Sequence, residues 1–398
     1  MKRVLILLLL PLFCLAACHD PEEEEKDRQV VFVYFAGNNS LASEGIGDLE
    51  EIKESYLPAT KDREKIVLVF HHFVDANPQL IRLSRDRRDN VVEEVIMEYP
   101  FDTNSGDTRT FASVLSDAQK AWPAAHYGLI LWSHGSGFLP IGYYVDPKEK
   151  AAGEPVMQVE DPYADLVKAG DDVKSFAEDH GTEMDIIELK NVLSRSHYDY
   201  IIFDACLMAN VEVAHELRFC TDYLLFSPTE ILSDGFPYKS MLQPILTQQP
   251  EAAMLSIAYS YMSHYRALSG VYQSATITLV KTQGMNALAS ACKPIFQNHR
   301  EQILTLDRSG VQPYFRFNKH WFYDLDDFVG QVASESEYQA FSRALSGAVI
   351  FKDTTPRFLD IEIQHYSGLS SYIPRPEYTV LNNYYRTLSW NQATGLVE

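Results

Sequence analysis

Short apolar runs alternate with amphipathic segments through the first half of the chain. The runs 29–37 (QVVFVYFAG) and 65–73 (KIVLVFHHF) lack a polar face, which is typical of strands buried in a parallel sheet. The segment 108–122 instead has apolar residues at helical spacing, with Thr108 as its expected cap. This rhythm predicts a mostly parallel sheet with helices on both faces. Further strands are expected at 127–132, 200–203 and 222–230, and further helices at 43–56, 185–194 and from Leu207.

Beyond Tyr238 the pattern becomes mainly helical. A turn is expected at 233–237, where the sequence is Ser-Asp-Gly-Phe-Pro. Helices are expected at 252–268, 285–304, 324–332 and 335–345, with strand-like runs at 274–280 and 358–363.

A long polar connection, 139–185, interrupts the alternation directly after the strand at 127–132. So long a structureless connection within a domain is usually functional or mobile. Its lysines, Lys148, Lys150, Lys168 and Lys174, are candidate cleavage points, and a plain surface excursion is the alternative.

The N-terminus has the pattern of a bacterial lipoprotein signal. Lys2 and Arg3 precede the apolar run 4–17, which is too short to span a bilayer. The run ends Leu-Ala-Ala-Cys18, which resembles a lipobox, so Cys18 is the expected lipidated first residue. Acyl chains anchor a protein because each buried CH₂ adds ~0.8 kcal/mol of membrane affinity. We therefore expect a signal peptide at 1–17, an acidic tether at 18–28, and attachment to the outer membrane of a bacterial envelope, with surface exposure as one option.

Composition narrows the classes of partner. The chain has 398 residues, 46% of them hydrophobic, so a large packed core is expected. Its formal charge of -21 argues against nucleic acid, which needs clustered Lys and Arg, and favours a cationic substrate.

Five cysteines are present, of which Cys14 leaves with the signal and Cys18 would carry lipid. Three remain, and an odd number in an oxidising compartment leaves at least one thiol unpaired. Cys220 and Cys292 are expected to be buried structural residues.

Cys206 and His134 carry the candidate chemistry. Each follows an apolar strand, at 200–203 and 127–132, so in one parallel sheet both would lie on the same rim, where ligands bind. A helix starting just after Cys206 would favour its thiolate. His134 would then take the thiol proton while Cys206 attacks a carbonyl carbon. The backbone N–H groups of Gly135 and Cys206 are the expected oxyanion donors.

Asp204 and Asp234 are candidates for substrate binding. A bare carboxylate two positions before a nucleophilic thiol would raise the thiol pKa, so Asp204 makes sense if a substrate cation neutralises it. Asp234 could form a second wall of the same pocket. The alternatives are a helix cap for Asp204 and a turn residue for Asp234.

No metal site is expected. His71 and His72 are adjacent, and neighbours on a strand face opposite sides, so structural roles are favoured. The sequence shows no zinc-type spacing and no EF-hand, so no cofactor is predicted.

The motifs LILWSHGSGF and IIFDACLMANVEVAHEL resemble the histidine and cysteine motifs of the clostripain-like (C11) cysteine peptidases, relatives of caspases, gingipains and legumains. The resemblance extends to MDIIELKNVL, SPTEILSDGFPY, FYDLDDF, SGLSSYIPRPEY and YYRTLSW, and so covers nearly the whole mature chain.

This resemblance implies a fold and a set of roles. The fold would be an α/β caspase-like three-layer sandwich at 29–240, completed by a C-terminal α+β subdomain at 241–398. His134 and Cys206 would form the catalytic dyad, and Asp204 and Asp234 would line a pocket for Arg or Lys. Activating self-cleavage would fall within 139–185. Some members depend on calcium and others do not, so calcium stays open.

The predicted function is therefore a lipid-anchored cysteine endopeptidase that cuts proteins or peptides after Arg or Lys. Two alternatives stay open. One is an inactive binding lipoprotein on the same scaffold, and the other is a different thiol acyltransferase or amidase.

Overall fold

The computed structural model describes residues 28–144, 162–163, 166–167, 176–316 and 321–398. The predicted signal peptide, Cys18, nearly all of the tether at 18–28, and the four candidate cleavage lysines, Lys148, Lys150, Lys168 and Lys174, lie outside the described residues.

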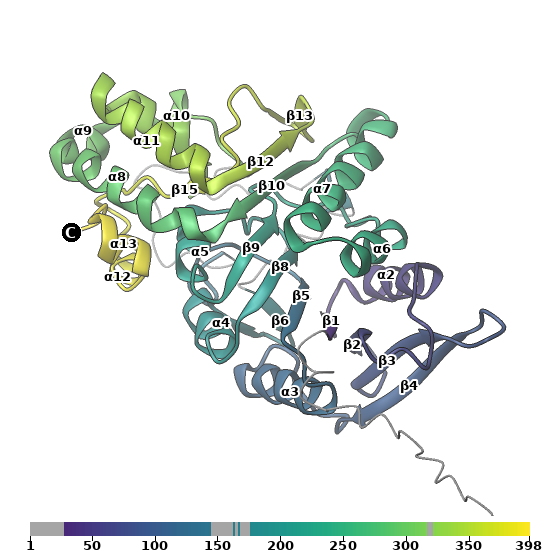
Figure 1. The fold of residues 1–398 in the computed structure, drawn as a ribbon. Coiled ribbons are helices and arrows are strands. Elements are labelled where there is room, and N and C mark those ends of the chain that lie inside the picture. The colour runs from purple at the N-terminus through teal and green to yellow at the C-terminus, as the bar shows by residue number, and fades with distance from the viewer. Residues whose placement is uncertain (1–27, 145–161, 164–165, 168–175, 317–320) are drawn as a thin grey trace, which may run out of the picture.

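A nine-stranded sheet forms the centre of the described chain, in the order β12-β10-β9-β8-β5-β1-β2-β3-β4 (Figure 1). The neighbouring strands from β2 through β1, β5 and β8 to β9 pair in parallel, whereas the strands outside them pair antiparallel. The strand bounds are β1 Gln29–Gly37, β2 Lys65–Phe73, β3 Gln79–Arg85, β4 Val91–Glu98, β5 His126–Trp132, β8 Tyr198–Asp204, β9 Thr221–Phe226, β10 Thr276–Lys281 and β12 Val349–Thr354.

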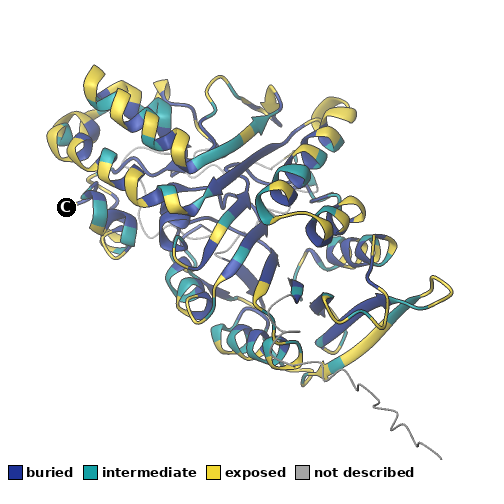
Figure 2. Ribbon diagram, viewed as in Figure 1, coloured by how far each residue is buried: buried dark blue, intermediate teal, exposed yellow. Residues whose placement is uncertain are grey.

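Helices cover both faces of the sheet (Figure 1). One face carries α2 Ala42–Glu54, α6 Tyr238–Thr247 and α7 Pro250–Ala267, and the other carries α3 Thr108–Ala121, α4 Ile186–Leu193, α5 Val211–Glu216 and α8 Met285–Asn298. The central strands are buried because they are apolar on both faces, and the helices expose only their outer sides (Figure 2). The predicted three-layer α/β sandwich is confirmed.

The remaining elements belong mainly to the C-terminal part of the chain. Since β10 and β12 join the central sheet, this part completes the sheet as well as adding helices. The helices are α9 Arg300–Thr305, α10 Leu325–Val332, α11 Glu335–Ala348, α12 Thr379–Tyr385 and α13 Ser389–Thr394, with short 3₁₀ turns η2 Gly270–Tyr272, η3 Thr282–Gly284 and η4 Arg308–Gly310. Three two-stranded pairs are β6 Phe176–Asp179 with β7 Thr182–Met184, β11 Tyr323–Asp324 with β15 Ser370–Ser371, and β13 Arg357–Phe358 with β14 Ile361–Glu362.

Several local predictions were wrong. The sequence pattern missed β3, β4 and β12; β4, an edge strand, is largely exposed and carries acidic residues, so it lacks a buried-strand signature (Figure 2). Asp107 rather than Thr108 caps α3, because its side chain accepts the Arg109 N–H. The expected helix at 285–304 is divided into α8 and α9 at His299.

The connection 139–185 is not structureless throughout. Its last residues form the β6–β7 hairpin, which leads to Asp185, the N-cap of α4. The Glu183 Oε1 atom accepts the Gly142 N–H at 2.7 Å, so the two ends of the connection are tied together.

Among the described residues, no helix combines the length and apolar character needed to cross a bilayer.

Candidate active site

The carboxyl ends of β5 and β8 bring His134 and Cys206 to the same rim. Trp132 and Asp204 are register partners on these parallel strands, and the predicted pair lies two residues beyond them. A side chain at Gly135 would lie 2.7 Å from the Cys206 carbonyl oxygen, so the two loops are in direct contact. Only a glycine permits this approach. The predicted oxyanion donors, the N–H groups of Gly135 and Cys206, therefore belong to adjoining stretches of chain.

Ser40 orients the imidazole of His134. Its Oγ atom lies 3.0 Å from His134 Nε2, which is hydrogen-bonding distance. Ser40 follows β1, the strand next to β5, so it reaches the site from the neighbouring carboxyl end. The sequence analysis missed it. The sequence signal that could have identified Ser40 was its position shortly after an apolar strand, which His134 and Cys206 share.

The backbone of Ile231 contacts the Cys206 sulfur. The Ile231 N–H donates to Sγ at 3.2 Å, and such a donor stabilises a thiolate. Leu207, the next residue, has a φ of 61°, a left-handed conformation that bulky residues rarely adopt. The side-chain amide of Asn210 donates to the Leu207 carbonyl at 2.9 Å and to Ser370 Oγ at 2.8 Å. The C-terminal part of the chain thus helps to hold the cysteine loop.

The expected contribution of a helix N-terminus to the thiolate was wrong. The helix α5 begins at Val211, five residues after Cys206, and spans only six residues. The intervening chain is folded into the turn at Leu207, which delays the helix. Since the N-cap of α5 is Asn210, the helix-cap interpretation of Asp204 is also excluded.

Gly137 joins the two loops and provides a stability prediction. Its φ is 64°, and an added Cβ would lie 2.1 Å from Asn210 Oδ1 and 2.6 Å from the Leu207 carbonyl oxygen. We expect Gly137→Ala to lower the free energy of unfolding by about 2 kcal/mol, measured by chemical denaturation, because strain and overpacking add. Gly142→Ala is the control, since Gly142 has a φ of 74° but no atom near its Cβ position. If both variants lost the same free energy of unfolding, the close approach of Gly137 to Asn210 and Leu207 would not explain the loss.

Asp204 lies deep in the site, whereas Asp234 lies at its outer edge. Asp204 is fully buried, and its Oδ2 accepts the Tyr238 hydroxyl at 3.0 Å. The side chain of Asp234 is 62% exposed, and its Oδ2 lies 2.6 Å from His264 Nε2. Burial, then the neighbouring Tyr261, and then the charges of Asp234 and Asp204 raise the pKa of Tyr265 well above its ordinary value. The charges of both aspartates therefore reach Tyr265.

A pocket of about 510 Å³ lies beside Asp234. Its walls include Leu166 from the long connection, Leu232 from the loop after β9, and Leu268 from the end of α7. Leu166 is fixed there, because its carbonyl accepts the Ser233 N–H at 2.9 Å. The neighbouring Val167 forms an antiparallel bridge with Leu232.

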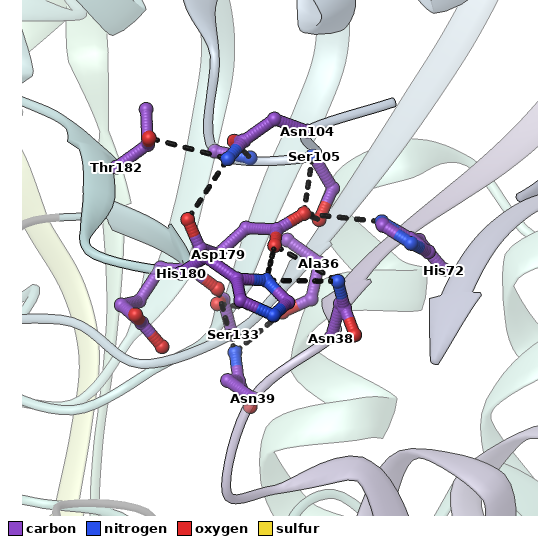
Figure 3. Close-up of polar contacts among 12 residues, drawn as sticks. Ala36, Asn38, Asn39, His72, Asn104, Ser105, Ser133, Asp179, His180 and Thr182 are labelled. Atoms are coloured by element: carbon purple, nitrogen blue, oxygen red, sulfur yellow. Dashed lines mark hydrogen bonds and ion pairs between the residues drawn. The ribbon is translucent and has the colours of Figure 1, made fainter. Parts of the chain in front are cut away.

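A polar network centred on Asp179 borders the site (Figure 3). The Asp179 carboxylate accepts hydrogen bonds from the Asn38 side-chain amide at 2.9 Å, from the Ser105 N–H at 2.6 Å and from the Ser105 hydroxyl at 2.8 Å. The rings of His72 and His180 contact the same carboxylate at 3.1 and 2.7 Å. Burial alone would raise the pKa of Asp179, but these hydrogen bonds outweigh it and hold the pKa well below its ordinary value. His72 therefore has a structural partner. Within the described ranges, no group of three potential ligands could hold a metal ion.

This network extends to the histidine loop. Asn39, the neighbour of Ser40, donates to the carbonyls of Glu178 and Ala36 at 2.8 and 3.0 Å, and the Ala36 carbonyl also accepts Ser133 Oγ at 2.9 Å (Figure 3). The hairpin that ends the long connection is thus bonded to the same loop that positions His134.

Cys220 and Cys292 lie buried, in agreement with the expected structural roles. Burial raises the pKa of the Cys220 thiol to about 11, and burial also raises that of Cys292 well above its ordinary value. Neither environment suits a nucleophile.

Comparisons with known proteins show which proteins the chain is similar to. The family model of the clostripain family matches residues 33–153 and 168–392. A zymogen C11 protease from Parabacteroides distasonis is 31% identical in sequence, with a TM-score of 0.75, covering 92% of this chain and 97% of that chain. A secreted C11 cysteine protease from Bacteroides thetaiotaomicron, solved with an irreversible peptide inhibitor, is 28% identical, with a TM-score of 0.76 and coverage of 92% and 98%.

Clostripain itself, from Hathewaya histolytica, is 23% identical over 253 residues. That match covers 56% of this chain and 43% of clostripain, so the chain spans less than half of that relative's length. The family match extends over most of the chain and includes both rim motifs. The chain therefore belongs to the clostripain family (C11) of cysteine peptidases, hydrolases that act on peptide bonds.

Proposed function

We propose that the protein is a lipid-anchored endopeptidase that cuts after Arg or Lys with His134 and Cys206 as its catalytic pair. The observation that carries this proposal is the contact between the two loops, in which Gly135 packs against the Cys206 carbonyl. A thiol and an imidazole on adjoining loops are the groups that acyl transfer through a thioester requires.

The proposed reaction has two halves. His134 takes the thiol proton, and the Cys206 sulfur attacks the scissile carbonyl carbon while backbone N–H groups hold the oxyanion. The imidazolium then protonates the leaving amine, the C–N bond breaks, and a thioester remains. In the second half His134 deprotonates a water molecule, which attacks the thioester. The carboxylic acid leaves, and the proton returns to the sulfur.

The buried carboxylate of Asp204 supports a preference for a basic residue. In a site of low dielectric, a buried carboxylate interacts strongly with a cationic side chain of the substrate. An apolar substrate side chain would instead leave that buried charge without a partner, which costs free energy. A panel of fluorogenic peptides with Arg, Lys, citrulline, Leu or Asp before the scissile bond tests this preference. Citrulline matches Arg in shape without its charge. Equal cleavage after citrulline and Arg would refute the preference, and no cleavage of any peptide would favour the binding-lipoprotein alternative.

Self-processing within 139–185 is the second part of the proposal. Cys206 and His134 are both 0% exposed, so a substrate requires a change at the site. The Leu166–Val167 segment lies antiparallel on Leu232, as an extended peptide substrate would. The P. distasonis relative was solved as an inactive zymogen.

We expect the cut to follow Lys168, the next residue in the sequence after Val167. Lys168→Ala should leave a single chain on a denaturing gel under conditions in which the wild type is cut, because the expected cleavage site then lacks a basic residue. Lys174→Ala, another lysine of the same connection, should be processed normally. Unchanged processing of Lys168→Ala would place the cut elsewhere.

Membrane attachment rests on the sequence around Cys18. We propose that Cys18 is lipidated and anchors the enzyme to the outer membrane of a bacterial envelope. Cys18→Ser should move the protein from the detergent phase to the aqueous phase in Triton X-114 partitioning. Cys14→Ser lies within the expected signal peptide and is the control. Wild-type protein found in the aqueous phase would contradict anchoring.

A further inference from the structure

A second cavity lies in the C-terminal part of the described chain. Its volume is about 460 Å³, close to that of the pocket beside Asp234, and the two cavities share no lining residue. Its lining combines apolar side chains with two arginines and a tyrosine. The apolar residues are Leu306, Val311, Pro313 and Phe315, and the polar residues are Asp307, Arg308, Ser309, Tyr323, Arg375 and Glu377.

Three segments that are distant in the chain bring the two arginines and the tyrosine to this cavity. Arg308 begins η4, Tyr323 begins β11, and Arg375 lies between β15 and α12. The hydroxyl of Tyr323 is close enough to sense both arginines. Burial raises the pKa of Tyr323 to about 12, and the positive charges of Arg375 and Arg308 oppose that rise. The cavity therefore contains a local concentration of positive charge in a chain whose formal net charge is -21.

The protein supplies Arg308 with neutral partners. Its guanidinium donates to the Leu306 carbonyl at 3.4 Å and to the Pro374 carbonyl. Among the described residues, no carboxylate lies within ion-pair distance of Arg308. Burial, and then the charge of Arg375, lower the pKa of Arg308 below its ordinary value. A half-buried cation beside a second cation costs free energy, which an anion in the cavity would recover.

The two carboxylates at this cavity are exposed to solvent. The Asp307 carboxylate caps η4, where it accepts the Ser309 N–H at 3.0 Å and the Ser309 hydroxyl at 2.7 Å. The Glu377 side chain is 47% exposed, and its Oε1 atom lies 3.9 Å from Arg375 Nη1. Solvent screens exposed charges, so these carboxylates only weakly offset the charge of the two arginines.

Arg316 shows how the same part of the chain pairs a buried arginine for a structural purpose. Its Nε and Nη2 atoms donate to the two carboxylate oxygens of Glu230 at 2.6 and 3.1 Å, and both side chains are buried. Such a two-point pair satisfies the planar guanidinium and balances its charge. Arg308 has no carboxylate of this kind among its partners.

We propose that this cavity binds a carboxylate attached to an apolar group about as large as one amino-acid side chain. The carboxylate would accept hydrogen bonds from Arg308 and Arg375, because a guanidinium matches a carboxylate in geometry and charge. The apolar group would lie against Leu306, Val311 and Phe315. Apolar walls with a few polar groups are typical of small-ligand sites. A free organic acid and the C-terminal residue of a peptide both present this chemistry.

Ligand-observed NMR titrations of the wild-type protein test the proposal with three probes. These are 4-methylpentanoate, N-acetyl-L-leucine and N-acetyl-L-leucinamide, and the last has the shape of the second without its charge. We expect at least one carboxylate to bind about tenfold or more tightly than the amide. Tighter binding of 4-methylpentanoate would identify a free acid as the ligand, and tighter binding of N-acetyl-L-leucine would identify a peptide C-terminus. If neither carboxylate binds, or if the amide or inorganic phosphate binds as tightly, the proposal is overturned.

Arg308→Gln should raise the Kd of the tighter carboxylate about tenfold and leave that of the amide unchanged. Arg300→Gln is the matched control, because Arg300 is a partly buried arginine that pairs with Glu398 at 3.2 Å and does not line the cavity. An unchanged Kd in Arg308→Gln with a normal melting curve would overturn the assignment. If Arg308→Gln does not fold, the comparison of carboxylate and amide on the wild type still decides. These titrations need no peptidase activity, so their outcome is independent of the proposed function.

Discussion

Cys206→Ala is expected to lower kcat/KM for peptide substrates by about 10⁴-fold or more, because the reaction loses its nucleophile and the remaining groups form no thioester. His134→Ala should have a loss of similar size, and the double variant should lose no more than either single variant. Residues that act as one unit show such non-additivity. The measurement is steady-state cleavage of a fluorogenic peptide with Lys before the scissile bond.

A labelling experiment separates loss of catalysis from loss of structure. A basic peptidyl acyloxymethyl ketone should alkylate Cys206 in the wild type, as identified by mass spectrometry, and should label neither Cys206→Ala nor His134→Ala at an appreciable rate. Cys220→Ala is the control, because the Cys220 thiol is buried with a raised pKa and should not contribute. Retained peptidase activity in Cys206→Ala would end the proposal of a thioester pathway. Labelling at Cys220 or Cys292 would contradict the assignment of the nucleophile.

Asp204→Asn is expected to lower kcat/KM for Arg and Lys peptides by about 10³-fold, since a substrate cation would then be buried without its counter-charge. The Tyr238 hydroxyl can still donate to an amide oxygen at the same position, so the local packing should survive. Citrulline peptides should be cut at close to the wild-type rate. The panel described above measures this change as a ratio within one enzyme preparation.

Asp234→Asn provides the comparison for Asp204→Asn. The carboxylate of Asp234 is largely exposed, and solvent screening weakens exposed charge pairs, so its loss should cost less than about tenfold. A larger effect at Asp234 than at Asp204 would reverse the assignment of the deep carboxylate.

The sequence by itself was sufficient for the layered architecture and for the two rim motifs. The apolar runs that became β1, β2, β5 and β8 have no polar face, and only a sheet covered on both sides buries such runs. His134 and Cys206 each follow one of these runs, and parallel strands end at one edge. Their common location therefore followed from chain order and strand direction alone.

The sequence pattern did not predict the contacts between segments that are distant in the chain. Ser40 and Ile231 have no local signature, because each acts through a partner at least 25 positions away in the chain. The late start of α5 depends on the left-handed turn at Leu207, whose amide and carbonyl groups are bound by Thr229 and Asn210. Local periodicity records which face of an element is buried, but not which neighbour buries it. Only the tertiary structure decided which side chains surround the sulfur, the imidazole and the deep carboxylate.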